Sequence, residues 1–384
     1  MPVRLTKASY HGRARQPLQR SCRLLFVTTL AVFVTPHGFG HAARASAIMA
    51  AMHHRSPDVH FEIFTDVPRW FFSESLPPCF TYHRMACDVG LVQRSPLEED
   101  LERTIARLED SPVYDSDAID RVARRLERLH CRLVIADIAP FGIAVAERLG
   151  TSSVLVENFT WDWIYSAYSG ASEGLLHHAR QLATVFAGAN LRLQTEPVCS
   201  PVPTATLVPP VGRVPHSAKA DVRHLLEIPQ DDSMILLSMG GIRWDYGGLS
   251  ELENQDQAWI VVPGGSRVAR RRGRLILLPF HAGVFHPDLV FAADLVVGKL
   301  GYSTVAEIYL AGVAYGYIAR PEFPESPVLK TWVEQHLTAL EIDEDTFRRG
   351  DWLARVGPLL AVPHRPCERV NGADTAGKVI LDLL

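Results

Sequence analysis

Short apolar runs alternate with amphipathic segments along most of the chain, and this alternation limits the folds open to it. In the first half, the apolar runs are rich in β-branched and aromatic residues and lie at residues 30–35, 59–66, 131–140 and 152–158. Such runs are typical of buried parallel strands. Segments with helical periodicity lie between them, at residues 40–56, 97–110, 117–130 and 141–150. The alternation predicts an α/β fold with helices on both faces of a parallel sheet.

A second series of the same kind follows a proline-rich stretch. Six prolines stand between residues 197 and 215, a density that argues against a continuous helix or strand. Beyond them, further strands are expected within residues 233–241, 258–265, 273–280, 293–312 and 314–323. A length of 384 residues suits two domains. The predicted division is a basic disordered tail (1–23), an N-terminal domain (24–196), a linker (197–217) and a C-terminal domain (218–384).

The first residues imitate a targeting signal. Residues 1–23 carry six basic side chains and no acid, and an apolar run, LLFVTTLAVFV, follows. A signal peptide is the alternative reading of this pattern. However, the run is too short to span a bilayer as a helix, and it continues into TPHGFGH without a small-residue cleavage site. We therefore interpret it as the first strand, and we expect no transmembrane segment.

Charge and cysteine content narrow the classes of partner. The formal net charge is −4, so the sequence has no strongly basic footprint for nucleic acid. The six cysteines are scattered and form no CxxC pair, which argues against a zinc site and a disulfide framework. A reducing cytoplasm is the expected location.

Distinctive residues gather where the predicted strands end. They are His37–His41, Asp137, Gly240–Gly241, Gly264–Gly265 and Gly301–Thr304. In open parallel sheets, ligands bind outside the carboxyl ends of the strands. The coincidence predicts a ligand cleft between the two domains.

The segment TPHGFGHAAR, residues 35–44, places a histidine at the start of the first helix. Near neutral pH, His41 could take a proton from a hydroxyl as that oxygen attacks. Asp137, at the end of a neighbouring strand, is the candidate acid that holds its other nitrogen. The alternatives are that Asp137 caps the next turn and that His37 is the relevant histidine. Arg44 either holds an anionic group or is an ordinary surface arginine.

The segment GKLGYSTVAE, residues 298–307, is the most informative motif of the second half. Gly301 permits a tight turn, and free amides at the following helix start favour a phosphate. Glu307 lies one turn further and could accept a sugar hydroxyl. The alternative is a capping box, in which Ser303 or Thr304 caps the helix and pairs with Glu307.

Other motifs are less specific. Gly240 and Gly241 allow close backbone approach to a phosphate or form an ordinary turn. The arginines of residues 267–274 could attract an anionic acceptor or lipid surface, but a solvated surface run is the preferred reading. Aromatic residues within 157–165 suit a sugar ring or, more commonly, a core. The DSD at 115–117 fits a helix cap better than a metal ligand pair, and we predict no metal site.

Taken together, four segments resemble a known family. TPHGFGHAAR, VENFTWDWIY, GKLGYSTVAE and RPEFPESPVL occur in this order. They are similar to the glycosyltransferase-like proteins related to the N-terminal domain of plant arabinokinases. More distantly, the chain is similar to GT-B glycosyltransferases such as the bacterial GlcNAc transferase that forms lipid II. The resemblance spans residues 30–340 and implies two Rossmann-like domains facing a cleft, with a nucleotide-sugar held mainly by the second.

The resemblance also assigns roles to residues. His41 matches the base and Asp137 its acidic partner. Glu307 matches the acid that binds the nucleotide ribose, while Phe280 falls where the backbone contacts the base. The diphosphate loop corresponds to Gly301, Ser303 and Thr304, and the donor-sugar contacts fall at residues 324–327, which include Glu325. The chain departs from the family in two ways: no glycine-rich kinase loop follows, and PEFPES lacks the glutamines of well-studied members.

The leading hypothesis is a metal-independent, inverting glycosyltransferase. It would use a nucleoside-diphosphate sugar as co-substrate, preferably a UDP-sugar, and would need no other cofactor. The acceptor would be a small molecule or a lipid-linked hydroxyl, which leaves peripheral membrane contact open. A non-catalytic module that binds a sugar nucleotide is the alternative, and a sugar-nucleotide epimerase or hydrolase on the same fold is a third. Neither ATP-dependent phosphorylation nor nucleic-acid binding is expected.

Overall fold

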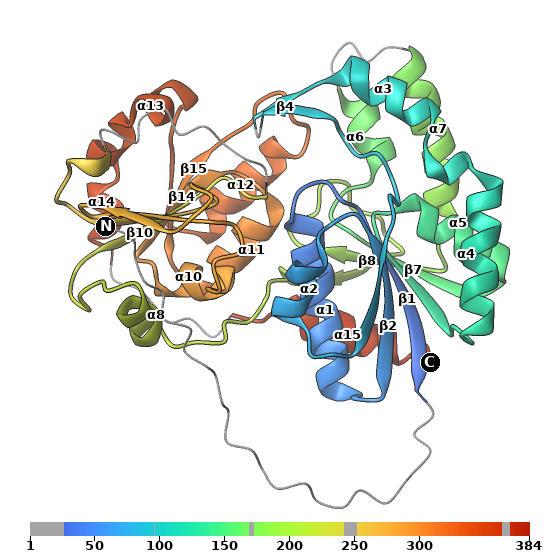
Figure 1. The fold of residues 1–384 in the computed structure, drawn as a ribbon. Coiled ribbons are helices and arrows are strands. Elements are labelled where there is room, and N and C mark those ends of the chain that lie inside the picture. The colour runs from blue at the N-terminus through green and yellow to red at the C-terminus, as the bar shows by residue number, and fades with distance from the viewer. Residues whose placement is uncertain (1–26, 96, 169–172, 242–251, 363–368) are drawn as a thin grey trace, which may run out of the picture.

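Two lobes, each built around one sheet, lie side by side in the computed structural model (Figure 1). The structure describes residues 27–95, 97–168, 173–241, 252–362 and 369–384. The predicted basic tail, 1–23, lies outside the described residues. Each sheet has seven strands and carries helices on both faces, so the expectation of an α/β fold with two Rossmann-like domains is confirmed.

The first sheet has the strand order β3-β2-β1-β6-β7-β8-β9 and is parallel throughout. Its strands are β1 (Thr28–Val34), β2 (Val59–Thr65), β3 (Phe80–Arg84), β6 (Leu133–Asp137), β7 (Ser152–Glu157), β8 (Leu191–Thr195) and β9 (Thr206–Val208). One face is covered by α1 (Gly40–Arg55), α2 (Arg69–Ser75) and α15 (Gly372–Leu381). The other is covered by α4 (Ser116–Arg128), α5 (Pro140–Leu149) and α7 (Glu173–Ala187). The central strands are apolar on both sides because both faces are buried.

The second sheet has the order β12-β13-β11-β10-β14-β15-β16, in which only β12 runs antiparallel to its neighbour. Its strands are β10 (Met234–Ser238), β11 (Trp259–Pro263), β12 (Arg270–Arg272), β13 (Leu275–Leu278), β14 (Leu295–Lys299), β15 (Ala314–Ile318) and β16 (Ala339–Glu341). The helices of this half are α8 (Lys219–Leu225), α10 (His286–Ala292), α11 (Tyr302–Ala311), α12 (Ser326–His336), α13 (Glu344–Arg349), η2 (Asp351–Arg355) and α14 (Gly357–Leu360).

A small hairpin of the first half reaches the second lobe. It consists of β4 (Gln93–Ser95) and β5 (Glu98–Glu99), and α3 (Leu101–Glu109) follows it. Leu97 packs against the apolar cluster under the second sheet. The remaining elements of the first half are η1 (Pro112–Tyr114) and α6 (Trp161–Ala167).

Both sheets reverse their strand order beside their first strand. The chain runs outward from β1 to β2 and β3, then returns to place β6 on the other side of β1. In the second sheet, β11 and β13 lie on one side of β10, and β14 lies on the other. Ligands of parallel sheets bind at such switch points. In this chain, the loops after β1 and β10 lie in contact. Gly241 of the second loop is so close to Phe39 of the first that a side chain at residue 241 would collide with the phenyl ring.

Three local features differ from the predicted division. Strand β9 lies inside the predicted linker and belongs to the first sheet. Helix α15 lies at the end of the predicted second domain, yet it packs on α1 of the first lobe. Within residues 97–110, the helix begins only at Leu101, where Asp100 caps it by accepting a hydrogen bond from the amide of Arg103. Periodicity could not indicate the first two, because both depend on contacts between distant segments.

No helix in the described part of the chain combines the length and the apolar character that a membrane crossing requires.

The position of α15 predicts that the C-terminal helix stabilises the first lobe. Ile380 is fully buried against the cluster that contains α1. We expect Ile380→Ala to lower the free energy of unfolding by about 2–4 kcal/mol through loss of buried area and creation of a cavity. Leu383 on the same segment is half exposed, so Leu383→Ala should change stability by less than about 0.5 kcal/mol. Equal effects of the two variants in urea unfolding would contradict the docking of α15.

Candidate functional site

His41 and Asp137 meet at the switch point of the first sheet. Val34 pairs with Asp137 across β1 and β6, and His41 lies in the first turn of α1, which follows β1. His41 Nδ1 and Asp137 Oδ1 are 3.0 Å apart, and the side chain of Asp137 is 1% exposed. The structure thus brings the two residues together, as the sequence predicted. Their catalytic roles stay a prediction.

Arg44 binds the same carboxylate. Its Nε donates to Asp137 Oδ2 over 2.9 Å, and its Nη2 donates to Oδ1 over 2.7 Å. Burial would raise the pKa of Asp137, but the charge and hydrogen bonds of Arg44, together with His41, lower it. Burial lowers the pKa of His41, although the hydrogen bond to Asp137 opposes this change. The reading of Arg44 as a surface arginine is wrong, because the guanidinium is buried, and the anionic group that it holds here is the carboxylate of Asp137.

The other wall of the cleft comes from the second lobe. A cavity beside His41 is lined by the loop after β1 and by the loops after β10 and β14, including Gly240, Gly241 and Gly301. Gly240 has a φ of +75°, which favours glycine, and a side chain at Gly241 would lie 2.6 Å from the ring of Phe39. These glycines therefore allow two loops from different lobes to approach closely.

Helix α11 begins at this cavity without a side-chain cap. Its N-cap is Gly301, so Ser303 and Thr304 lie within the first helical turn. The alternative of a capping box with Glu307 is wrong, because no side chain caps the helix and Glu307 binds other partners. Among contacts within the described residues, the first amide of this helix with a partner is that of Val305, which donates to the carbonyl of Gly301. The preceding amides are available to an anion.

Two cations line the same cavity. Burial and the charge of Arg320 lower the pKa of Lys299 to about 7. Arg320 is 4% exposed, and its Nε and Nη1 make no hydrogen bond within the described part of the chain. Its nearest carboxylates are Glu99, at 3.5 Å, and Glu325, at 3.8 Å. Such under-bonded cations suit an anionic ligand.

Glu325 also belongs to this cavity and connects the lobes. Its Oε1 accepts a 2.8 Å hydrogen bond from Nδ2 of Asn158, which follows β7 of the first lobe. Burial raises the pKa of Glu325, and Arg320 opposes this rise.

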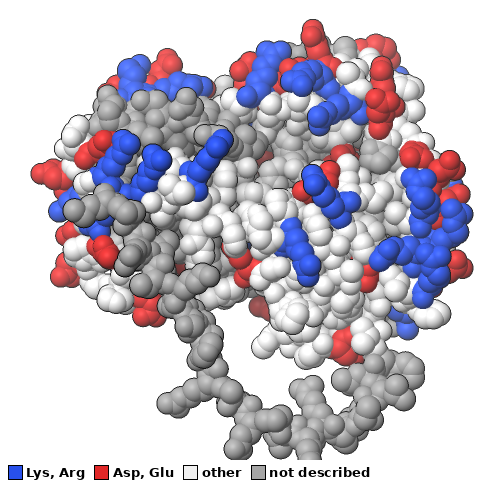
Figure 2. Space-filling view, viewed as in Figure 1, with Lys and Arg blue, Asp and Glu red and all other residues white. Residues whose placement is uncertain are grey.

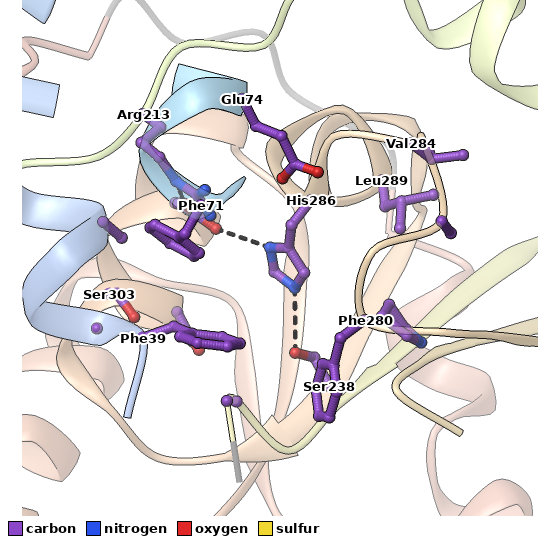
Figure 3. Close-up of a pocket in the computed structure, with 18 of the residues that line it drawn as sticks. Phe39, Phe71, Glu74, Arg213, Ser238, Phe280, Val284, His286, Leu289 and Ser303 are labelled. Carbon is purple, nitrogen blue, oxygen red and sulfur yellow. Dashed lines mark hydrogen bonds and ion pairs between the residues drawn. The ribbon is translucent and has the colours of Figure 1, made fainter. Parts of the chain in front are cut away.

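A second, aromatic cavity continues from the first (Figure 3). Phe39 and Phe280 meet edge to face with their ring centres 5.9 Å apart, and Phe71 projects into the same space. Glu307 lies at the wall, where Arg213 Nε donates to its Oε1 over 3.0 Å. His286 stands between Ser238 and Glu307, with contacts of 3.2 and 3.1 Å.

The charge of Glu307 is held by these neighbours. Burial opposes its ionisation, but Arg213 and His286 outweigh burial and lower its pKa. A carboxylate has about four acceptor positions, so these two contacts leave room for a ligand hydroxyl. The structure therefore groups Glu307, Phe280, Ser303 and Thr304 around one cavity and His41, Glu325 and Gly301 around the adjoining one.

Other sequence motifs have structural roles. Phe159, Trp161 and Tyr165 of the aromatic segment are buried in a core cluster, which confirms the core reading. Asp115 caps α4 by accepting a hydrogen bond from the amide of Ala118. Three arginines of the run at 267–274 pair with carboxylates: Arg271 with Glu227, Arg272 with Glu253, and Arg274 with Asp232. Basic and acidic side chains are interspersed on the face shown in Figure 2. No group of three metal-ligating side chains occurs among the residues that the structure describes.

Sequence reasoning missed Lys299, Arg320, Arg213 and His286. Lys299 stands inside GKLGYSTVAE, at the end of a buried strand, so its position was a usable signal. Arg320 likewise follows β15 within the RPEFPESPVL segment. Arg213 lies in the predicted linker and His286 in a loop-helix junction, and neither carries a local pattern.

The chain is similar to one curated plant protein. It is 28% identical to the L-arabinokinase of Arabidopsis thaliana over 363 residues, which cover 91% of this chain and 34% of that protein. It therefore spans about a third of the length of that relative. No protein-family model matches the chain.

Solved structures share the fold at low sequence identity. They include UGT89C1 of Arabidopsis thaliana complexed with UDP (TM-score 0.62, 13% identity, 93% of this chain and 99% of that one). The spinosyn forosaminyltransferase SpnP has a TM-score of 0.60 at 13% identity, covering 93% and 94%. MurG of Acinetobacter baumannii has a TM-score of 0.53 at 16% identity, covering 92% and 99%. The chain thus has the GT-B glycosyltransferase fold, and the resemblance expected from the motifs is confirmed.

The buried carboxylate of Asp88 gives a stability prediction. Burial raises its pKa to about 7, although Thr35 and the Trp161 N–H, which donates to Oδ2 over 2.8 Å, oppose this rise. Between about pH 4 and 7 the folded chain keeps a proton that the unfolded chain has lost, so stability falls as pH rises. We expect Asp88→Asn to be more stable than the unmodified protein at pH 8, by about 2–4 kcal/mol, but not at pH 4.

Urea unfolding at the two pH values measures this effect. Asp66 is exposed, so Asp66→Asn should leave the pH dependence nearly unchanged. If Asp88→Asn retained the full loss of stability between pH 4 and 8, the assignment to Asp88 would be wrong.

Proposed function

We propose that the chain is a glycosyltransferase that moves a sugar from a nucleoside-diphosphate sugar, preferably a UDP-sugar, to the hydroxyl of an acceptor. The observation that carries this proposal is the position of His41. Its Nδ1 is bonded to buried Asp137, while the ring lines the cavity where α11 begins. A base and an anion site therefore face the same space. The GT-B fold and the complex of UGT89C1 with UDP support a uridine nucleotide.

Two parts of the site would bind the donor. The aromatic cavity with Phe280 and Glu307 would hold the base and ribose, since a buried carboxylate accepts hydroxyl protons. The diphosphate would lie at the amides of α11, with Gly240 and Gly241 allowing close approach. Glu325, which lines the same cavity as Lys299, would accept hydroxyls of the sugar.

The chemistry follows from these positions. With its Nδ1 proton directed at Asp137, the neutral imidazole of His41 presents Nε2 as a proton acceptor. The acceptor oxygen would lose its proton to Nε2 while it forms a bond to the anomeric carbon. The bond from that carbon to the diphosphate oxygen breaks, and the electron pair leaves with the diphosphate. A single displacement of this kind inverts the anomeric centre.

Positive charge for the leaving group comes from the chain itself. Lys299, Arg320 and the α11 amides surround the expected place of the diphosphate. Because these groups would stabilise the charge of the leaving diphosphate, we propose that the transfer needs no metal ion. The acceptor would be a small molecule or a lipid-linked hydroxyl compound.

The role of His41 is tested by its removal. We expect His41→Ala to lower kcat by about 10²–10⁴-fold, because the proton acceptor is lost, while UDP affinity changes less than about twofold. Transfer from UDP-sugars to an acceptor mixture and calorimetric titration of UDP measure the two effects. His54→Ala, an exposed histidine of the same helix, is the control. Full turnover in His41→Ala would exclude His41 as base, and UDP binding without transfer in the unmodified protein would favour a sugar-nucleotide sensor.

The role of Lys299 is tested by pH. Because its pKa lies at about 7 in the free protein, the ammonium that attracts a diphosphate is lost as pH rises. We expect UDP affinity to fall about tenfold between pH 7 and 8.5. Lys299→Arg keeps its charge and should show a much flatter dependence. Equal slopes for the two proteins in calorimetry would place the diphosphate away from Lys299.

A further inference from the structure

Arg44 is a fully buried arginine at the centre of the site. It lies one turn after His41 on α1, and its side chain is 1% exposed. Beyond its two bonds to Asp137, Nη1 donates to Asn158 Oδ1 over 2.8 Å and to Thr195 Oγ1 over 3.2 Å. Its guanidinium also lies over the ring of Tyr302, 5.0 Å from the ring centre. The planar fork of an arginine matches a carboxylate in this two-bond geometry.

This pairing determines how Asp137 can act on His41. Both oxygens of Asp137 accept hydrogen bonds from Arg44, and Oδ1 is shared with His41 Nδ1. Because Arg44 keeps Asp137 ionised, the carboxylate oxygens can only accept, so the proton between the pair belongs to His41 Nδ1. The ring then has one orientation and one tautomer, with Nε2 unprotonated.

The charges around His41 point the same way. On α1 and β6 it faces Arg44 and Asp137, and from β14 it faces Lys299. His37 lies in the loop before it, and Arg320 beyond Lys299 lowers the pKa of His37. Tyr302 of α11 stacks on Arg44 rather than on the imidazole. A bare Asp137 would draw a proton onto His41, and the Arg44 cation opposes that attraction.

We propose that Arg44 is a positioning residue, which neutralises Asp137, fixes the proton of His41 on Nδ1 and keeps Nε2 free to accept the proton of the acceptor. The proposal rests on His41 being the base of the proposed transferase. Arg44 itself touches neither the acceptor nor the donor in this role. It acts on His41 through its pairing with Asp137 and through its own charge, since its Nη2 lies 3.3 Å from His41 Nδ1.

The titration of His41 tests this role without any substrate. The imidazole signal of His41, assigned by its loss in His41→Asn, is followed by NMR against pH in the full chain. We expect Arg44→Gln, which keeps hydrogen-bond donors but lacks the charge, to raise the midpoint by about 1 pH unit or more. Arg44→Lys keeps the charge and should titrate close to the unmodified protein. Asn158→Ala removes one bond of Arg44 but no charge, so it should also leave the midpoint in place.

A purely structural role for Arg44 predicts a different result. If folded Arg44→Gln titrated like the unmodified protein, the proposal would be overturned. Should Arg44→Gln not fold, Asp137→Asn is compared with the double variant Arg44→Gln/Asp137→Asn, which has no unpaired buried charge. The double variant should titrate about 1 pH unit above Asp137→Asn, because the cation beside His41 has gone. Equal midpoints would overturn the proposal in this form too.

Turnover separates this inference from the proposed function. If the chain transfers sugar, the acid limb of kcat/KM in Arg44→Gln should move to higher pH together with the NMR midpoint. If the NMR midpoint of His41 moved but neither the unmodified protein nor any variant transferred sugar, the charge coupling between Arg44 and His41 would stand and the proposed transferase activity would be refuted. In an active Arg44→Gln variant, the NMR midpoint of His41 could move while the acid limb of the kcat/KM profile stays in place. That result would refute the link between Arg44 and the base.

Discussion

The carboxyl ends of two parallel sheets face one another, and the whole site depends on this arrangement. Each sheet reverses its order beside its first strand, and the loops after β1 and β7 meet those after β10, β14 and β15 around one cavity. A crevice outside a switch point is where parallel sheets bind ligands. Glycine at residue 241 lets the two loops approach to a distance that a larger side chain would forbid. The proposed base, diphosphate site and sugar contacts all lie along this junction.

The charged side chains at this junction differ in how fully they are paired within the protein. In the first lobe, Arg44 and Asp137 neutralise each other through two hydrogen bonds. On the side of the second lobe, Arg213 and His286 similarly hold Glu307. Within the described part of the chain, Arg320 is less completely hydrogen-bonded, and burial lowers the pKa of Lys299. An anionic ligand such as the proposed diphosphate would supply hydrogen-bond partners for Arg320.

Much of this was predictable because it is local. Alternating apolar runs predicted four strands of the first sheet and five of the second, and strand ends predicted His41 and Asp137 as neighbours. The strands that the runs did not indicate are β3, β8, β9, β12 and β16. Local spacing misled at Glu307, where Thr304 to Glu307 fits a capping box but the structure turns the carboxylate to Arg213. Spacing also did not decide whether Arg44 is buried or exposed. An arginine three residues after a histidine is buried only if the fold brings an acidic side chain next to it. The docking of α15 on α1 and the pairing of β9 had no local signal at all.

The sequence by itself determined the elements, their α/β alternation and the polar and glycine-rich loops at the strand ends, because these follow from neighbours a few positions apart. Only the tertiary structure decided which charges pair. Arg44 and Asp137 are 93 positions apart, and Arg213 and Glu307 are 94 apart. Such contacts depend on strand order and on how helices pack over it. The pairing of His41, Arg44 and Asp137 therefore exists only once the first sheet has assembled, and the cavity beside it exists only once the two lobes meet.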